Sequence, residues 1–166
     1  LADLLRESGL PHALVNVEQG WLRRGDRRLR NFSSERPFAV DLIVVNADQL
    51  PAVCARHGIG PARGRYRVGY WFWELSRFPE PLHGAYEHVD EVWVASDFCR
   101  QALAAPARRP VHKVVPRLRA EPAGRRDRAA FGLGDEFTFL FVYDAASIVK
   151  RKNPGAAVAA FRRAFR

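Results

Sequence analysis

The chain has 166 residues, 48% of them hydrophobic, and a formal net charge of +9 at pH 7. This length and composition are typical of a globular protein with one ordinary domain. No run approaches the roughly 20 apolar residues of a membrane span, and no signal peptide is recognisable. Methionine is absent, and the chain opens directly on a helical pattern, Leu1, Leu4 and Leu5. We therefore expect a piece of a longer polypeptide, truncated at both ends.

The positive charge is concentrated in residues 21–36, 106–128 and 150–166, which together carry +16 and leave −7 for the rest. Only three of the 27 cations are lysine, which indicates a GC-rich coding bias. Anionic partners and a solvated, codon-biased surface both remain open, and nucleic acid is less favoured than either. Cys54 and Cys99 lack any paired spacing, so we expect two reduced, buried thiols of a cytoplasmic protein.

Apolar patterns alternate between strand and helix along the chain. We expect strands at 12–17, 39–45, 66–72, 91–95, 112–116 and 137–143. Helices are expected at 1–8, 48–57, 79–88, 97–105 and 154–166. A basic loop at 20–37 and a linker at 119–135, containing a short helix at 125–131, complete the chain. Repeated β-α units predict an α/β fold, a Rossmann-like parallel sheet with helices on both faces.

The end of the chain carries the strongest local signals. The run Phe137–Tyr143 is apolar or aromatic at nearly every position, which predicts a strand covered on both faces. Asn153 and Pro154 form a helix-start signature, a capping side chain followed by a ring that needs no N–H. Val158, Phe161 and Phe165 share one face of that helix, so we expect it to pack on the strand.

Three cations, Lys150, Arg151 and Lys152, precede this helix. A helix N-terminus above a parallel strand favours a phosphate, and an ammonium there adds to the backbone N–H groups. Lys152 is therefore the strongest single candidate for holding a diphosphate. The alternative is a solvated charge cluster, which is disfavoured because cations oppose the dipole at a helix N-terminus.

In parallel sheets, ligands bind at the carboxyl ends of the strands. That rule selects Asn46, the pair Trp73 and Glu74, and Ser96, each of which follows a predicted strand. An acid on an aromatic platform suits a hydroxyl-rich acceptor, although Trp71 and Phe72 are rather expected to be core. Ser96 is expected to cap a helix, with substrate contact as the alternative. Asn46 either forms a turn or lines the crevice.

Several other site classes are disfavoured. The chain contains no G-x-S-x-G elbow, no Walker A motif and no correctly spaced dinucleotide fingerprint. Its five histidines show no metal-ligand spacing, so no metal is expected. The basic loop 21–36 interleaves aromatic and aliphatic residues with arginines. It is expected either to be a mobile loop or, if helical, to rest on an anionic membrane surface or meet an acidic acceptor.

The order of VDLIVVNADQLP, RYRVGYWFWELSRFPEP, VDEVWVASDFCRQAL, KVVPRL, FGLGDEFTFLFVYD and RKNP resembles the family-four (GT-B fold) glycosyltransferases. The resemblance covers the chain from about residue 39 to its end. It implies two Rossmann-like domains facing each other across a cleft, one for the acceptor and one for a nucleotide-sugar. Residues 1–118 resemble part of the acceptor domain, 119–135 the linker, and 136–166 the first β-α unit of the donor domain.

The resemblance implies transfer of a hexose-like sugar from a nucleotide-sugar to a glycan or lipid acceptor, without a metal or other cofactor. Lys152 and Arg151, with Asn153, would hold the donor diphosphate; Glu74, Asn46, Trp73 and Ser96 are weaker candidates for acceptor binding. The fragment alone is expected to be inactive, and the full-length enzyme to be cytoplasmic or membrane-peripheral.

The chain departs from the family pattern at one donor position, where many members carry Gly-Arg and this chain has Phe141-Val142. The family's E-x7-E motif also lies outside the sequence. The alternative to a transferase is a non-catalytic Rossmann-like domain that docks a polyanion or a protein partner.

Overall fold

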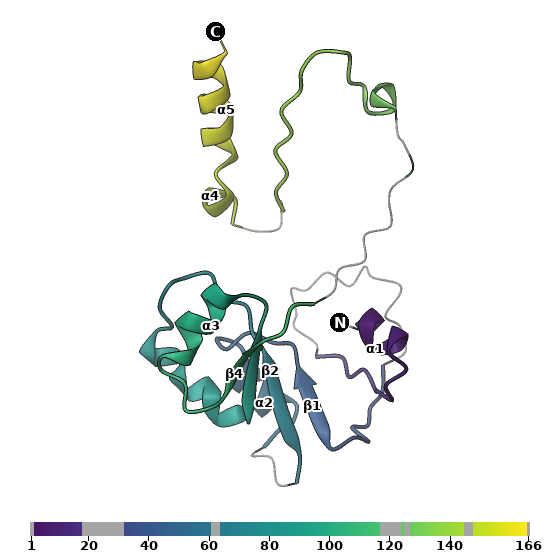
Figure 1. Ribbon diagram of the computed structural model, residues 1–166, viewed down its shortest axis with the longest axis vertical. Coiled ribbons are helices and arrows are strands. Elements are labelled where there is room, and N and C mark those ends of the chain that lie inside the picture. Colours follow the sequence, from purple (N-terminus) through teal and green to yellow (C-terminus); the bar gives the residue numbers. More distant parts are fainter. Residues whose placement is uncertain are drawn as a thin grey trace. The chain divides into compact units, whose positions relative to one another are not determined.

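The computed structural model describes residues 2–17, 32–60, 64–116, 124, 127–144 and 148–165 (Figure 1). The chain divides into two compact units, Leu1–Arg119 and Ala120–Arg166. The acceptor and donor roles assigned to these parts of the chain remain predictions. Residues 20–31 of the predicted basic loop lie outside the described residues, as does much of the linker.

The first unit contains a four-stranded parallel sheet in the order β1-β2-β3-β4. The strands are β1 (Val40–Ile43), β2 (Tyr66–Tyr70), β3 (Glu91–Val94) and β4 (Val111–Lys113). Helices α2 (Leu50–Arg56), η1 (Glu80–His88) and α3 (Asp97–Ala104) connect them in turn. The predicted α/β class with a parallel sheet is therefore confirmed.

The core lies between one face of the sheet and these three connecting helices. The pairings Ile43↔Gly69 and Gly69↔Val92 place these three residues on that face. The same buried cluster includes Leu50 and Cys54 from α2, Ala85 and Tyr86 from η1, and Ala102 and Leu103 from α3. Strands that advance in one direction through right-handed crossovers place every connection on the same face. Helices were predicted on both faces; in the described part of the chain, the three connecting helices pack on this one face.

Gly69 is required by the close approach of Trp71. A Cβ atom on Gly69 would lie 2.7 Å from Trp71 Nε1. The ring of Trp71 is almost fully buried and packs against Phe78 and Tyr86. The expectation that Trp71 belongs to the core is confirmed. The same expectation for Phe72 is wrong, because half of its surface is exposed.

Helix η1 is a 3₁₀ helix over the residues where 79–88 was expected to be helical. Pro81 lies in its first turn and Gly84 in its middle, and both residues disfavour a regular α-helix. Tyr86 anchors the element, because its hydroxyl donates a 2.8 Å hydrogen bond to the Leu103 carbonyl. Burial raises the pKa of Tyr86, so the phenol remains a donor at neutral pH.

The strand predicted at 12–17 is wrong. Helix α1 (Ala2–Glu7) precedes this segment, which has no regular secondary structure. The backbone of Leu14 accepts one hydrogen bond from Ser33, at 2.7 Å. A strand needs a repeating ladder of such bonds, and an apolar alternation alone does not supply a neighbour to pair with.

The covered strand predicted at 137–143 is also wrong. These residues have no regular structure, and Phe137, Leu140 and Val142 are each more than three-quarters exposed. The described residues of this unit contain no second strand that could satisfy the backbone of the segment. The apolar sequence predicts a strand covered on both faces, but burial depends on neighbouring elements rather than on composition.

The second unit contains η2 (Arg128–Phe131), α4 (Val149–Lys152) and α5 (Pro154–Ala164). Arg128 donates hydrogen bonds to the carbonyls of Gly134 and Glu136, both at 2.7 Å. The predicted packing of the last helix on segment 137–143 is confirmed at one residue. The ring of Phe139 lies 5.5 Å from that of Phe161 and 5.2 Å from that of Phe165.

Replacing Leu103 tests the position of the core. The side chain is fully buried, so Leu103→Ala should lower the free energy of unfolding by about 2–5 kcal/mol through lost burial and a residual cavity. Leu75→Ala is the matched control, because Leu75 is 62% exposed and should change stability by less than about 0.5 kcal/mol. Urea unfolding followed by circular dichroism measures both. Equal losses would contradict the described core.

Candidate functional site

The carboxyl ends of β1 and β2 are joined by one side chain. Asn46 Oδ1 accepts a 2.9 Å hydrogen bond from the backbone N–H of Phe72. The Asn46 carbonyl also accepts from the N–H groups of Gln49 and Leu50, which starts α2. Both alternatives for Asn46 are thus compatible with its position, since it builds the turn and is exposed at the carboxyl edge of the sheet.

Trp73 and Ser96 lie at the same edge. Cys99 Sγ lies 3.1 Å from the Trp73 carbonyl and links the segment after β2 to α3. The Ser96 hydroxyl accepts a 3.2 Å hydrogen bond from the Cys99 N–H, which confirms Ser96 as the N-cap of α3. The half-buried Trp73 ring packs edge-on against Phe78, and its indole N–H donates to the Arg77 carbonyl at 2.9 Å.

Charged groups near this edge include Glu74, Asp97 and Lys113. Glu74 is exposed in the segment that follows β2. Asp97 begins α3 and forms an ion pair with Lys113, the last residue of the neighbouring strand β4. The hydrogen bond from Lys113 lowers the pKa of Asp97, so this carboxylate is ionised at neutral pH. The sequence does not indicate this ion pair, because Asp97 and Lys113 are 16 residues apart and meet only through the tertiary structure.

Large apolar side chains are exposed around these polar groups. Phe72 is 50% exposed, Leu75 62% and Phe98 51%. Phe72 and Leu75 follow β2, whereas Phe98 lies in the first turn of α3. Aromatic rings beside hydroxyl, amide and carboxylate groups can stack on the C–H face of a ligand while the polar groups accept its hydrogen bonds.

The role of Ser96 as a cap can be measured. Ser96→Ala should destabilise the protein by about 1 kcal/mol, because the Cys99 N–H at the start of α3 loses its partner. The control is Ser76→Ala, which removes an exposed serine from the loop after β2. Thermal unfolding of both variants measures the difference, and equal stabilities would exclude a capping role.

In the second unit, Asn153 joins two helices. It has a left-handed backbone, φ 49° and ψ 51°, and it ends α4 while starting α5. Its side chain accepts a 3.3 Å hydrogen bond from the Ala156 N–H, and Pro154 follows in the first turn. The predicted capping signature is confirmed. One first-turn N–H of α5 is already bonded to Asn153, and Pro154 has none to offer.

The three cations before α5 form the last turn of α4. Positive charge is favoured at a helix C-terminus. The unfavourable position of these cations at a helix N-terminus, which the sequence led us to expect, is therefore replaced by a favourable one. Lys152 is half-buried beside Asn153, while Lys150 and Arg151 are exposed. The structure thus brings Lys152, Arg151 and Asn153 together at the junction of the two helices.

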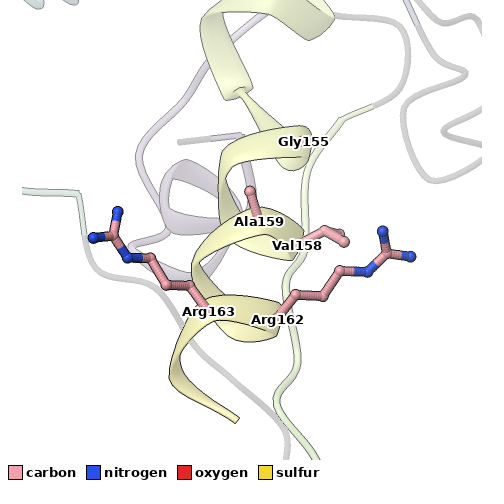
Figure 2. A pocket seen from close by; sticks show the side chains of 5 residues that line it. All are labelled: Gly155, Val158, Ala159, Arg162 and Arg163. Carbon is pink, nitrogen blue, oxygen red and sulfur yellow. The ribbon is translucent and has the colours of Figure 1, made fainter. Parts of the chain in front are cut away.

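A shallow hollow of about 490 Å³ runs along α5 (Figure 2). It is lined by Gly155, Val158, Ala159, Arg162 and Arg163. The two guanidinium groups project to opposite sides of the helix, so they do not converge on one ligand. A single helix lines this hollow, and it does not include Lys152. We therefore do not assign it to the candidate site.

A charged cluster that sequence reasoning missed surrounds Asp41 in β1. Arg65 binds its carboxylate through two hydrogen bonds, Nε to Oδ2 at 2.9 Å and Nη2 to Oδ1 at 2.6 Å. Arg36 Nη1 and Arg67 Nε each lie 3.9 Å from Asp41 Oδ2. Burial alone would raise the pKa of Asp41, but the Arg65 hydrogen bonds and the three positive charges outweigh it and lower the pKa.

The register of the sheet explains this cluster. Asp41 pairs directly with Arg67, so their side chains share the core face of the sheet. An acid in one predicted strand and an arginine in the next could have indicated the pair. The sequence does not give the register, and Arg36 and Arg65 lie outside the strands.

Asp41→Asn tests the cluster by its pH dependence. A folded pKa below the unfolded value of 3.8 means that the carboxylate stabilises the fold above that pH and loses this effect as the pH falls through its folded pKa. We expect Asp41→Asn to cost about 3 kcal/mol at pH 7, because buried arginine is left without its carboxylate.

The difference between the wild type and Asp41→Asn should shrink below about pH 4, as measured by urea unfolding at pH 7 and pH 3. Asp3→Asn is the control, since its carboxylate is 63% exposed and its pairing with Arg6 contributes little. A loss of stability that is the same at both pH values would contradict a charge-based role for Asp41.

Among the residues that the structure describes, no three His, Cys, Asp or Glu side chains are grouped so that they could hold a metal ion. The same residues include no helix of the length and apolarity needed to cross a membrane. Cys54 and Cys99 are both buried and unpaired, as expected. No protein-family model, curated protein or solved structure matches this chain.

Proposed function

We propose that the chain is part of a GT-B-type glycosyltransferase that transfers a hexose-like sugar from a nucleotide-sugar to a glycan or lipid acceptor. The observation that carries this proposal is the carboxyl edge of the parallel sheet. There Asn46, Trp73 and Ser96 are tied together through Phe72 and Cys99. Ligands of open parallel sheets bind at this edge.

The acceptor would bind at this edge of the first unit. Glu74 would accept hydrogen bonds from sugar hydroxyls, and the Trp73 ring would stack on the sugar's C–H face. The Asn46 amide retains N–H donors after its oxygen has bonded Phe72. Ser96 is engaged as a cap, so its part in acceptor binding is the weakest of the four.

The nucleotide-sugar would bind through the junction of α4 and α5. Lys152 and Arg151 would contact the two phosphates, and Asn153 would fix the direction of the helix start. The junction concentrates three cations in one turn, which gives a favourable field for a diphosphate. Stabilising the departing diphosphate lowers the barrier to transfer, because negative charge develops there as the glycosidic bond breaks.

The decisive measurement is donor binding by the full-length protein. We expect Lys152→Ala to weaken the affinity for a nucleotide-sugar or nucleoside diphosphate by about tenfold or more, since a charge-assisted contact is lost. Arg163→Ala is the control, because it removes one exposed cation from the same unit. Isothermal titration measures both variants. Unchanged affinity in Lys152→Ala would remove Lys152 from the donor site.

Titrating the same variants with heparin as well as with a nucleotide-sugar separates this proposal from a non-catalytic polyanion-binding domain. Such a domain would bind heparin in preference to nucleotide-sugars and would be weakened equally by Lys152→Ala and Arg163→Ala. Saturable binding of a nucleotide-sugar, sensitive to Lys152 and not to Arg163, supports the transferase.

A further inference from the structure

The cluster around Asp41 contains more positive charge than its described residues neutralise. Arg36, Arg65 and Arg67 carry three positive charges, and Asp41 is the one acid with which they form ion pairs in the described part of the chain. Arg65 takes both carboxylate oxygens in hydrogen bonds, which leaves Arg36 and Arg67 at 3.9 Å. The residual charge of the cluster is therefore about +2.

Arg67 is the costly member of this group. Its side chain is 5% exposed, and its Nε has no hydrogen-bond partner among the described residues. A buried guanidinium normally forms hydrogen bonds with an anion, because removing it from water is otherwise expensive. The arrangement as described leaves this requirement unmet.

The neighbouring groups do not provide the missing negative charge. Asp90 accepts a 2.8 Å hydrogen bond from the backbone N–H of Arg67, and among the described residues the Arg67 guanidinium forms its ion pair with Asp41 rather than with Asp90. The Cys54 thiol lies within electrostatic reach of Arg36 and Arg67. Burial raises the pKa of Cys54 despite these cations, so the thiol is neutral at pH 7 and supplies no charge.

The three arginines of the cluster differ in their exposure to solvent. Exposure of the arginine side chains increases from 5% for Arg67 through 25% for Arg65 to 36% for Arg36. Arg65 is held in place by Asp41 and by its 2.9 Å hydrogen bond to the Arg36 carbonyl. Arg36 and Arg65 therefore present the positive charge of the cluster to solvent, whereas Arg67 adds its charge from a buried position.

We propose that Arg36, Arg65 and Arg67 form a binding site for a phosphate group, at the first two strands of the sheet and apart from its carboxyl edge. A phosphate carries a charge between −1 and −2 near pH 7, which matches the residual charge of the cluster. Guanidinium groups bind phosphate oxygens in paired hydrogen bonds, so the partly exposed Arg36 and Arg65 would contact the anion, and the buried Arg67 would add its charge.

Titration with inorganic phosphate at constant ionic strength tests the proposal. We expect saturable binding with a dissociation constant below about 10 mM and a matching rise in the midpoint of thermal unfolding. Glycerol phosphate is titrated in parallel. Tighter binding of this monoester identifies a phosphorylated ligand, and tighter binding of inorganic phosphate identifies the free ion; either result supports the site.

Arg36→Gln is the informative variant, because Arg36 is the most exposed of the three arginines and its replacement should leave the fold intact. It should lose about tenfold or more in phosphate affinity. Arg109→Gln removes the same charge from an exposed position outside the cluster and should bind as the wild type does.

Phosphate also stabilises proteins non-specifically by exclusion from their surface. Equal thermal shifts in the wild type, Arg36→Gln and Arg109→Gln would show that effect alone and would overturn the proposal. The absence of saturable phosphate binding to the wild-type protein would overturn it independently of any variant. That result would indicate that another group of the protein neutralises Arg67.

Discussion

The central strand β2 is the element on which the rest of the first unit depends. It pairs in parallel with β1 on one side and with β3 on the other. Its small residue Gly69 makes room for Trp71, whose ring packs against Phe78 and Tyr86. Because backbone pairing and aromatic burial meet in this strand, the loop that follows it is held at the carboxyl edge of the sheet.

Two polar regions result from this arrangement, and they differ in how they are satisfied. At the carboxyl edge, Asn46 and Ser96 each bond a backbone N–H and leave exposed groups facing solvent. At the first two strands, Asp41 accepts two hydrogen bonds from Arg65 but interacts with Arg67 only electrostatically. A buried cation with an incomplete partner is costly, whereas exposed groups at a sheet edge are not, so the second region makes the stronger demand for a ligand.

Local sequence patterns predicted the elements whose signals are local. The helix starts at Ser96 and Asn153 were expected from capping residues and have the predicted hydrogen bonds. Patterns that depend on a neighbour were less informative. The segments at 12–17 and 137–143 have the composition of strands, yet in the described part of the chain neither pairs with a strand to complete a ladder.

The sequence by itself determined the parallel α/β class, the caps at Ser96 and Asn153, and the burial of Trp71, because periodicity and capping act over a few residues. Only the tertiary structure decided the register that sets Asp41 opposite Arg67, the exposure of Phe72, and the position of Lys150–Lys152 at the end of α4. These depend on which segments become neighbours in space. A one-residue shift in strand pairing would move Arg67 to the other face of the sheet and remove the cluster altogether.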